Sequence, residues 1–167
     1  MASGALSTMA SWPGHASAVE PDEQTPTRRA DLAAWLSALS LAGLGRPVGS
    51  RPDWEREATS VARSWLRLVD DGRHPASWAT AAPLLQEEVG PRAWDEALRA
   101  VRGPLGRCHW RKLESTTVVE GPAGDLRGPY VVIRFGSVFE RNRHAVETIT
   151  PMLGPDGGWR VVAYFIS

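Results

Sequence analysis

Three strand-like hydrophobic segments follow one another between residues 130 and 167. YVVIRFGSVF, AVETITPML and WRVVAYFIS are rich in β-branched and aromatic residues, and the short breaks ERNRH and GPDGG predict tight antiparallel turns. In a register that pairs Glu140 with Ala145 and Leu153 with Trp159, apolar side chains lie on both faces of the sheet. A sheet with one face in water would alternate apolar and polar residues, so we expect both faces to be covered. Pro151 cannot donate to the ladder and predicts a bulge or a bend there.

Helical spacing of apolar residues precedes these strands. Residues 53–72 predict one helix, ended by Gly72. A second stretch runs over residues 75–89 and should be kinked or divided by Pro83, and a third helix covers residues 91–103. The side chains expected to face the core are Ala58, Val61, Ala62, Trp65, Leu66, Val69, Trp78, Leu84, Leu85, Val89, Trp94, Ala97, Leu98 and Val101.

From Arg107 the pattern changes to alternation in CHWRKLESTTVVEG, which predicts a further strand. Strict alternation places Trp110, Thr116 and Val118 on one face, and Arg111 and Val119 on the other. The order is therefore three helices followed by four antiparallel strands. It predicts an α+β domain with the helices packed on one face of a curved sheet.

Composition narrows the classes of function. The 167 residues carry a formal net charge of zero, which argues against a strongly basic nucleic-acid surface. The single cysteine, Cys108, excludes an intramolecular disulfide and a cysteine-based zinc site. The four histidines have no ligand-like spacing, and no segment is long and apolar enough to span a bilayer. We therefore expect no metal, no cofactor, no nucleic acid and no integral membrane span.

The N-terminal third divides into three parts. Residues 1–27 are rich in Ser, Ala, Pro and Gly and predict a disordered leader, which a start codon assigned too far upstream would also explain. Residues 28–44 are either an amphipathic helix, with Leu32, Trp35, Leu36 and Leu39 on one face, or a degenerate signal that directs export to the periplasm. Residues 45–52 have the composition of a linker, so the α+β domain covers residues 53–167.

The polar residues on the otherwise apolar sheet are the candidate catalytic residues. In the register above Glu147 lies opposite Phe165 on the face that carries Arg134. A buried carboxylate needs a partner because desolvating it alone costs several kcal/mol. One interpretation pairs Glu147 with Arg111 or Arg134, or with backbone N–H groups. The other makes Glu147 a general base with a raised pKa, assisted by Tyr164 or His109.

A basic hairpin tip is the second candidate site. Arg141, Arg143 and His144 lie in the turn between two strands, with Arg134 nearby in the sequence. This cluster would suit an anion or an acidic partner, and the alternative is an ordinary solvated turn.

The chain resembles a bacterial family known as domain of unknown function 4019. The resemblance covers roughly residues 53–167 and rests on Trp65, Ser77-Trp78, Trp94, Arg102-Gly103-Pro104-Leu105-Gly106, Arg111, Tyr130-Val131-Val132, Phe135, Phe139, Glu147, Trp159-Arg160-Val161 and Tyr164. It implies no known activity. The layout is similar to the cystatin-like and nuclear-transport-factor-like half-cone folds, which host enzymes and binding proteins alike.

The expected function is a binding or assembly module that uses an apolar sheet face, with a homodimer, another protein or a small apolar ligand as its partner. One alternative is a small-molecule enzyme of the half-cone type with Glu147 as general base, and another is an exported envelope protein. A further hypothesis needs no partner, because the segment from Leu32 to Leu44 docks on the sheet face of its own domain.

Overall fold

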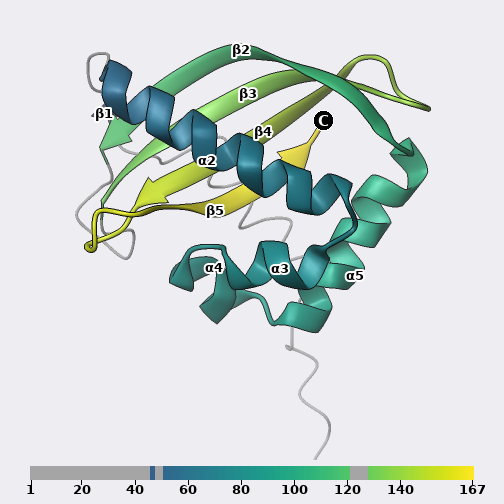
Figure 1. Ribbon diagram of the computed structural model, residues 1–167, viewed down its shortest axis with the longest axis horizontal. Helices are drawn as coiled ribbons and strands as arrows, with labels where there is room; N and C mark the ends of the chain where they lie inside the picture. The colour runs from purple at the N-terminus through teal and green to yellow at the C-terminus, as the bar shows by residue number, and fades with distance from the viewer. Residues whose placement is uncertain (1–45, 48–50, 121–127) are drawn as a thin grey trace, which may run out of the picture.

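The computed structural model describes residues 46–47, 51–120 and 128–167. The expectations for residues 1–27 and 28–44 fall outside the described residues. Within them, helices precede an antiparallel sheet, and this α+β architecture confirms the prediction from the sequence (Figure 1).

Prolines mark where the helices begin. The described residues form α2 (Pro52–Asp70), α3 (His74–Ala79), α4 (Pro83–Glu88) and α5 (Pro91–Arg102), followed by the 3-10 turn η1 (Gly103–Leu105). A proline stands in the first or second position of each α-helix, where its missing N–H leaves no helical hydrogen bond unmade. Pro83 divides the second predicted helix into α3 and α4, as expected.

The sheet is an antiparallel meander in the order β1-β2-β3-β4-β5. Its long strands are β2 (Cys108–Glu120), β3 (Pro129–Phe139), β4 (Ala145–Leu153) and β5 (Trp159–Ile166). The short edge strand β1 (Arg46–Pro47) lies inside the range that we expected to be a linker, and its Pro47 pairs with Val119 of β2. The chain therefore reaches α2 from the β2 edge of the sheet.

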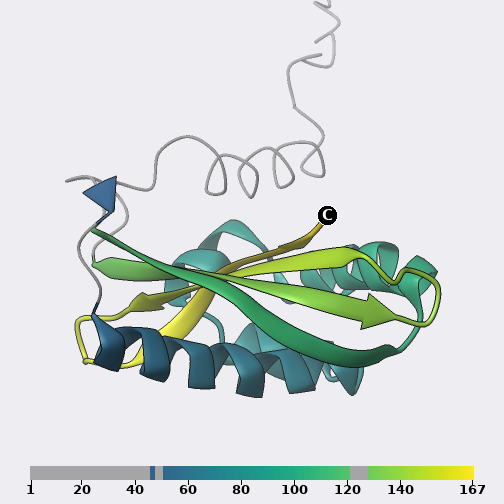
Figure 2. The ribbon, with the colours of Figure 1, turned by 90° about the horizontal axis from the view of Figure 1, so that it is seen from above.

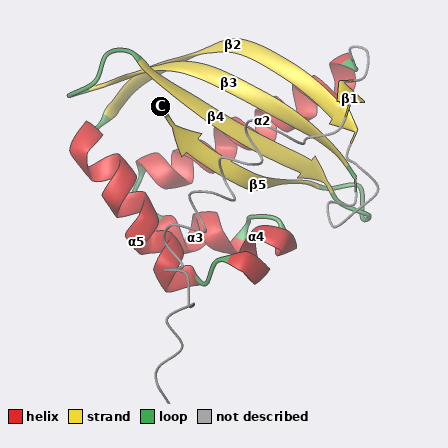
Figure 3. Ribbon diagram, turned by 180° about the vertical axis from the view of Figure 1, so that it is seen from behind, coloured by secondary structure: helices red, strands yellow, loops and turns green. Residues whose placement is uncertain are grey.

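Helix α2 lies along one face of the sheet, which we call the helix face (Figures 1 and 2). Helices α3 and α4 lie beyond the edge strand β5, and α5 runs along the end of the sheet toward the start of β2, as the view from behind shows (Figure 3). The Ala82 N–H donates to the Val161 carbonyl oxygen at 2.8 Å. The indole N–H groups of Trp65 and Trp94 both donate to Ser77, at 2.8 and 3.0 Å. These bonds connect α2 and α5 through α3.

The register between β3 and β4 differs from our expectation. Ala145 pairs with Ser137 rather than with Glu140. A shift by an odd number of residues exchanges the two faces of a strand, so Glu147 lies beside Phe135 on the helix face, and Arg134 lies on the opposite face, which we call the outer face. The predicted pairing of Leu153 with Trp159 and the bulge at Pro151 are confirmed.

A second bulge corrects the predicted faces of β2. The register with β3 shifts between Leu113 and Ser115, so strict alternation fails at Glu114. As a result Thr116 and Val118 share the helix face with Arg111, and the Thr116 hydroxyl donates to the Glu55 carboxylate of α2 at 2.9 Å. Val119 turns to the outer face.

The prediction that Val101 of α5 faces the core is wrong. Val101 is 45% exposed, whereas Arg102 is buried. Trp94, Leu98 and Arg102 follow one another at intervals of four residues and form the buried stripe of the helix. Arg102 occupies the last inward position of α5, where its guanidinium group binds the carboxylate of Glu147.

The connection from α5 to β2 yields a test with a matched control. Gly106 has φ +75°, and a Cβ at this position would lie 2.5 Å from Glu140 Oε2. Gly106→Ala should lower the free energy of unfolding by about 1–2 kcal/mol. Gly103→Ala should leave it unchanged or raise it by up to about 1 kcal/mol, because Gly103 has φ −53° and open space around it. Urea denaturation measures both, and equal effects would contradict the assigned backbone conformation.

Candidate functional site

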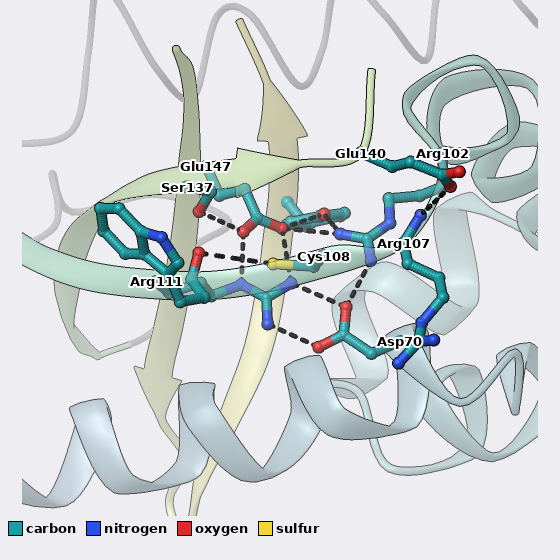
Figure 4. A network of polar contacts seen from close by, with 10 residues as sticks. Asp70, Arg102, Arg107, Cys108, Arg111, Ser137, Glu140 and Glu147 are labelled. Atoms are coloured by element: carbon teal, nitrogen blue, oxygen red, sulfur yellow. Dashed lines mark hydrogen bonds and ion pairs between the residues drawn. The ribbon is translucent and has the colours of Figure 1, made fainter. Parts of the chain in front are cut away.

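A charged cluster lies between α2, α5 and the helix face of the sheet, with its centre buried and its Asp70 end exposed. Its four members, which we call the charge quartet, are Asp70, Arg102, Arg111 and Glu147 (Figure 4). Glu147 is completely buried, and the side chains of Arg102 and Arg111 are 9% and 12% exposed. Two guanidinium groups face two carboxylates, so the quartet as a whole is neutral.

The carboxylate of Glu147 is saturated with hydrogen bonds. Its Oε1 accepts from Arg102 Nη1 at 2.9 Å, from Arg111 Nη2 at 3.1 Å and from the Tyr164 hydroxyl at 2.6 Å. Its Oε2 accepts from Arg111 Nε and from the Ser137 hydroxyl. Five donors on two oxygens compensate for the loss of hydration of this buried charge.

Asp70 closes the quartet from the last residue of α2. Its carboxylate accepts hydrogen bonds from Arg102 and, at 2.5 and 2.7 Å, from two nitrogens of Arg111. Arg102 is the last residue of α5, where a positive charge also interacts favourably with the helix dipole. The quartet therefore ties two helix ends to strands β2 and β4.

The surroundings hold Arg111 and Tyr164 each in one protonation state. Burial opposes the charge of Arg111, but its hydrogen bonds to Asp70 and Glu147 raise the pKa of the guanidinium above its ordinary value. Burial, reinforced by the negative charge of Glu147, raises the pKa of Tyr164 well above its ordinary value. Tyr164 therefore remains a neutral hydroxyl that donates to Glu147 and accepts from Arg102 at 3.1 Å.

The structure brings together some of the predicted catalytic residues and separates others. Glu147, Tyr164 and the predicted partner Arg111 are in contact. His109 is exposed beside the first irregularity of β2, and Arg134 is exposed on the outer face. Sequence reasoning missed Arg102 and Asp70 as partners of Glu147. The interval of four residues from Leu98 to Arg102 was the available signal for Arg102.

The basic residues of the β3–β4 turn are all exposed. Arg141 Nη1 donates to the Gly103 carbonyl oxygen at 3.2 Å, so this side chain contacts the α5–β2 connection. Arg143 and His144 line a shallow depression of about 260 Å³ with Trp110. Arg134 does not line it. The role of these four residues in binding remains a prediction.

The outer face carries a continuous row of apolar residues across the strands. Pro47 pairs with Val119, Val119 with Tyr130, and Tyr130 with Met152. The row continues through Val162 of β5 to side chains at the start of α4. We call the buried cluster Val119, Tyr130, Met152, Val162, Ala163 and Ala82, with the half-buried Val132 and Leu84, the apolar row.

A groove of about 930 Å³ opens at the α4 end of the apolar row. Ala82, Leu84 and Met152 form its apolar part, and Glu87 and Glu88 stand on its rim. Asp156 of the same rim is bound to Arg160 at 2.6 and 2.9 Å, whereas both glutamates are exposed and form no ion pair within the described part of the chain. The groove thus combines an apolar floor with uncompensated negative charge.

Tyr130 has an unusual environment in the middle of the apolar row. The residue is fully buried, and its hydroxyl has no hydrogen-bond partner among the described residues. Burial also raises the pKa of this hydroxyl. A buried polar group without a partner is rare in folded proteins.

Comparisons with known proteins yield one match. A family model described as "Protein of unknown function (DUF4019)" matches residues 61–164, more than half of the chain. No curated protein and no solved structure matches significantly. No helix in the described ranges is long and apolar enough to cross a membrane, and the described residues contain no group of three or more His, Cys, Asp or Glu side chains that could hold a metal ion.

The charge quartet predicts a strong effect of neutralising Glu147. Glu147→Gln leaves two buried guanidinium groups facing one carboxylate, and we expect a loss of about 3 kcal/mol in the free energy of unfolding. Glu114→Gln removes a charge from an exposed position of β2 and should change stability by less than about 0.5 kcal/mol. Chemical denaturation measures both, and a loss below 1 kcal/mol for Glu147→Gln would contradict a stabilising role for the quartet.

Removing the isolated hydroxyl of Tyr130 should not lower the free energy of unfolding, in contrast to the change at Glu147. Tyr130→Phe removes a buried polar group and no hydrogen bond to a described residue, so stability should stay the same or rise by up to about 1 kcal/mol. A loss of more than 1 kcal/mol in thermal denaturation would show that the hydroxyl has a partner outside the described residues.

Proposed function

We propose that this chain, which belongs to the DUF4019 family, is a binding module. Its partner is an amphipathic, basic helical segment of another protein, which binds on the apolar row of the outer face. The observation that carries this proposal is the apolar row itself, which runs across β2, β3, β4 and β5 into the groove beside α4. Apolar grooves of this kind receive the apolar face of a helix in many protein complexes.

The charges at the groove select the class of partner. Glu87 and Glu88 form no ion pair with another described residue, so a partner with basic residues next to its apolar stripe fits the rim better than an acidic one. Opposite charges at a rim mainly raise the rate of association and fix the orientation of the partner. Apolar contacts with the half-buried Val132 and Leu84, and with Met152 in the groove, would supply most of the affinity.

The state of Glu147 favours binding over catalysis. A general base must come within hydrogen-bonding distance of the proton that it removes. Glu147 is fully buried, and both of its oxygens already accept from neighbouring side chains. His109, the other proposed assistant, is exposed and forms no described contact with Glu147. These contacts support a structural role for the carboxylate.

A binding experiment tests the proposed function. The probe is a fluorescent synthetic peptide of about 17 residues, with leucines at helical spacing and two arginines at its N-terminus. Fluorescence anisotropy with the full chain should show saturable binding. Val132→Glu places a charge within the apolar row and should weaken binding at least about tenfold.

A matched substitution on the other face provides the control. Leu113→Glu makes a comparable apolar-to-acidic change at a position that is 36% exposed and shares the face of Phe135, and it should leave peptide affinity unchanged. Circular dichroism checks that both variants fold. Absence of binding at millimolar peptide would refute the proposal, as would equal loss in both variants. A doubled mass in light scattering that Val132→Glu abolishes would instead identify a second copy of the chain as the partner.

A further inference from the structure

We infer that residues 28–44 of this chain lie as a helix across the apolar row, with Arg28 and Arg29 beside Glu87 and Glu88, and so compete with a partner for the outer face. The competition with a partner rests on the proposed function, whereas the docking of residues 28–44 on the apolar row is independent of it.

The path of the chain places one end of this segment at the apolar row. Pro47 of β1 pairs with Val119, the first residue of the row on β2. Leu44 stands only three residues before Pro47 in the sequence, so it cannot be more than about 11 Å from that strand. The C-terminal end of the segment is therefore held near the β2 edge of the outer face.

The length of the segment matches the width of the surface. Four strand spacings separate β1 from β5, which amounts to about 19 Å across the sheet. A helix formed by residues 28–44 would be about 26 Å long. A helix that starts at the β1 edge therefore crosses the whole sheet and ends over α4.

The chemistry of the segment also matches. Leu32, Trp35, Leu36 and Leu39 recur at helical spacing and would face the apolar row. Arg28 and Arg29 lie at the far end, about one turn beyond Leu32. That end falls over α4, where Glu87 and Glu88 are exposed and uncompensated.

The burial of the apolar row requires a covering layer. Val119 and Tyr130 are 4% and 0% exposed, although they lie on the side of the sheet away from α2. Within the described residues, only Ala82 and Leu84 join the row from outside the sheet, and they lie at its β5 end. Residues outside the described ranges must therefore cover Val119 and Tyr130, and the segment before β1 carries an apolar stripe of the kind that could do so.

Charge reversal tests the placement in the full chain. Hydrogen–deuterium exchange followed by mass spectrometry should show protected amides in residues 32–44. The double variants Arg28→Glu/Arg29→Glu and Glu87→Lys/Glu88→Lys should each speed exchange there at least about fivefold, and combining them should restore protection. Glu114→Lys, an exposed change at the other end of the outer face, should have no effect. Exchange at the rate of an unstructured peptide, or no rescue in the combined variant, would overturn the inference.

The dependence on protein concentration distinguishes docking of residues 28–44 within one chain from docking on a second copy. Docking within one chain predicts a monomeric mass in light scattering and protection of residues 32–44 that is independent of protein concentration. Protection that rises with concentration together with a doubled mass would mean that the segment docks on a second copy, which contradicts the inference.

The synthetic peptide distinguishes this inference from the proposed function. If residues 28–44 compete for the apolar row, the chain with Arg28→Glu and Arg29→Glu should bind the peptide at least about tenfold more tightly than the native chain. Equal binding to both would refute the competition and leave the proposed function intact. Binding to neither would refute the proposed function, while the exchange experiment would still decide where the segment lies.

Discussion

The buried carboxylate of Glu147 is the constraint on which the helix side of this domain depends. A charge that is removed from water must be compensated in place, and Arg102 and Arg111 supply that compensation from two different elements. Asp70 balances the second positive charge. The ends of α2 and α5 are thereby attached to β2 and β4 at one point, and their relative positions cannot change without exposing a buried charge.

This arrangement also distinguishes the two faces of the sheet. The polar groups of the helix face form ion pairs and hydrogen bonds with one another, and α2 covers the apolar side chains around them. The outer face is different because its apolar row crosses the strands and ends in a groove with a negatively charged rim. The proposed binding function uses this outer face, and the buried Glu147 takes no part in it.

The edge strand β1 links this surface to the N-terminal part of the chain. By pairing with β2 it brings the preceding residues to the first residue of the apolar row. A segment so tethered is present at a high effective concentration near the surface, and even a weak contact can then compete with a free partner. Regulation by an attached segment would follow from the topology of the sheet, without any additional domain.

The sequence alone determined the elements of the fold. Helical spacing in residues 53–72 and 91–103, prolines at helix starts and the β-branched segments after residue 107 are local signals, and local steric preferences act through them. The division of the second helix at Pro83 and the bulge at Pro151 could be predicted in this way, whereas Arg111 was one of two arginines expected as partners of Glu147.

Only the tertiary structure decided which side chains meet. One extra residue at the Glu114 bulge, or a three-residue change in the β3–β4 turn, reverses the face of every following side chain, because the period of a strand is two. For that reason Arg134 could not be excluded as a partner of Glu147, and the row from Val119 through Tyr130 to Met152 could not be seen. Arg102 lies 45 residues before Glu147, and only the packing of α5 beside the sheet makes them neighbours.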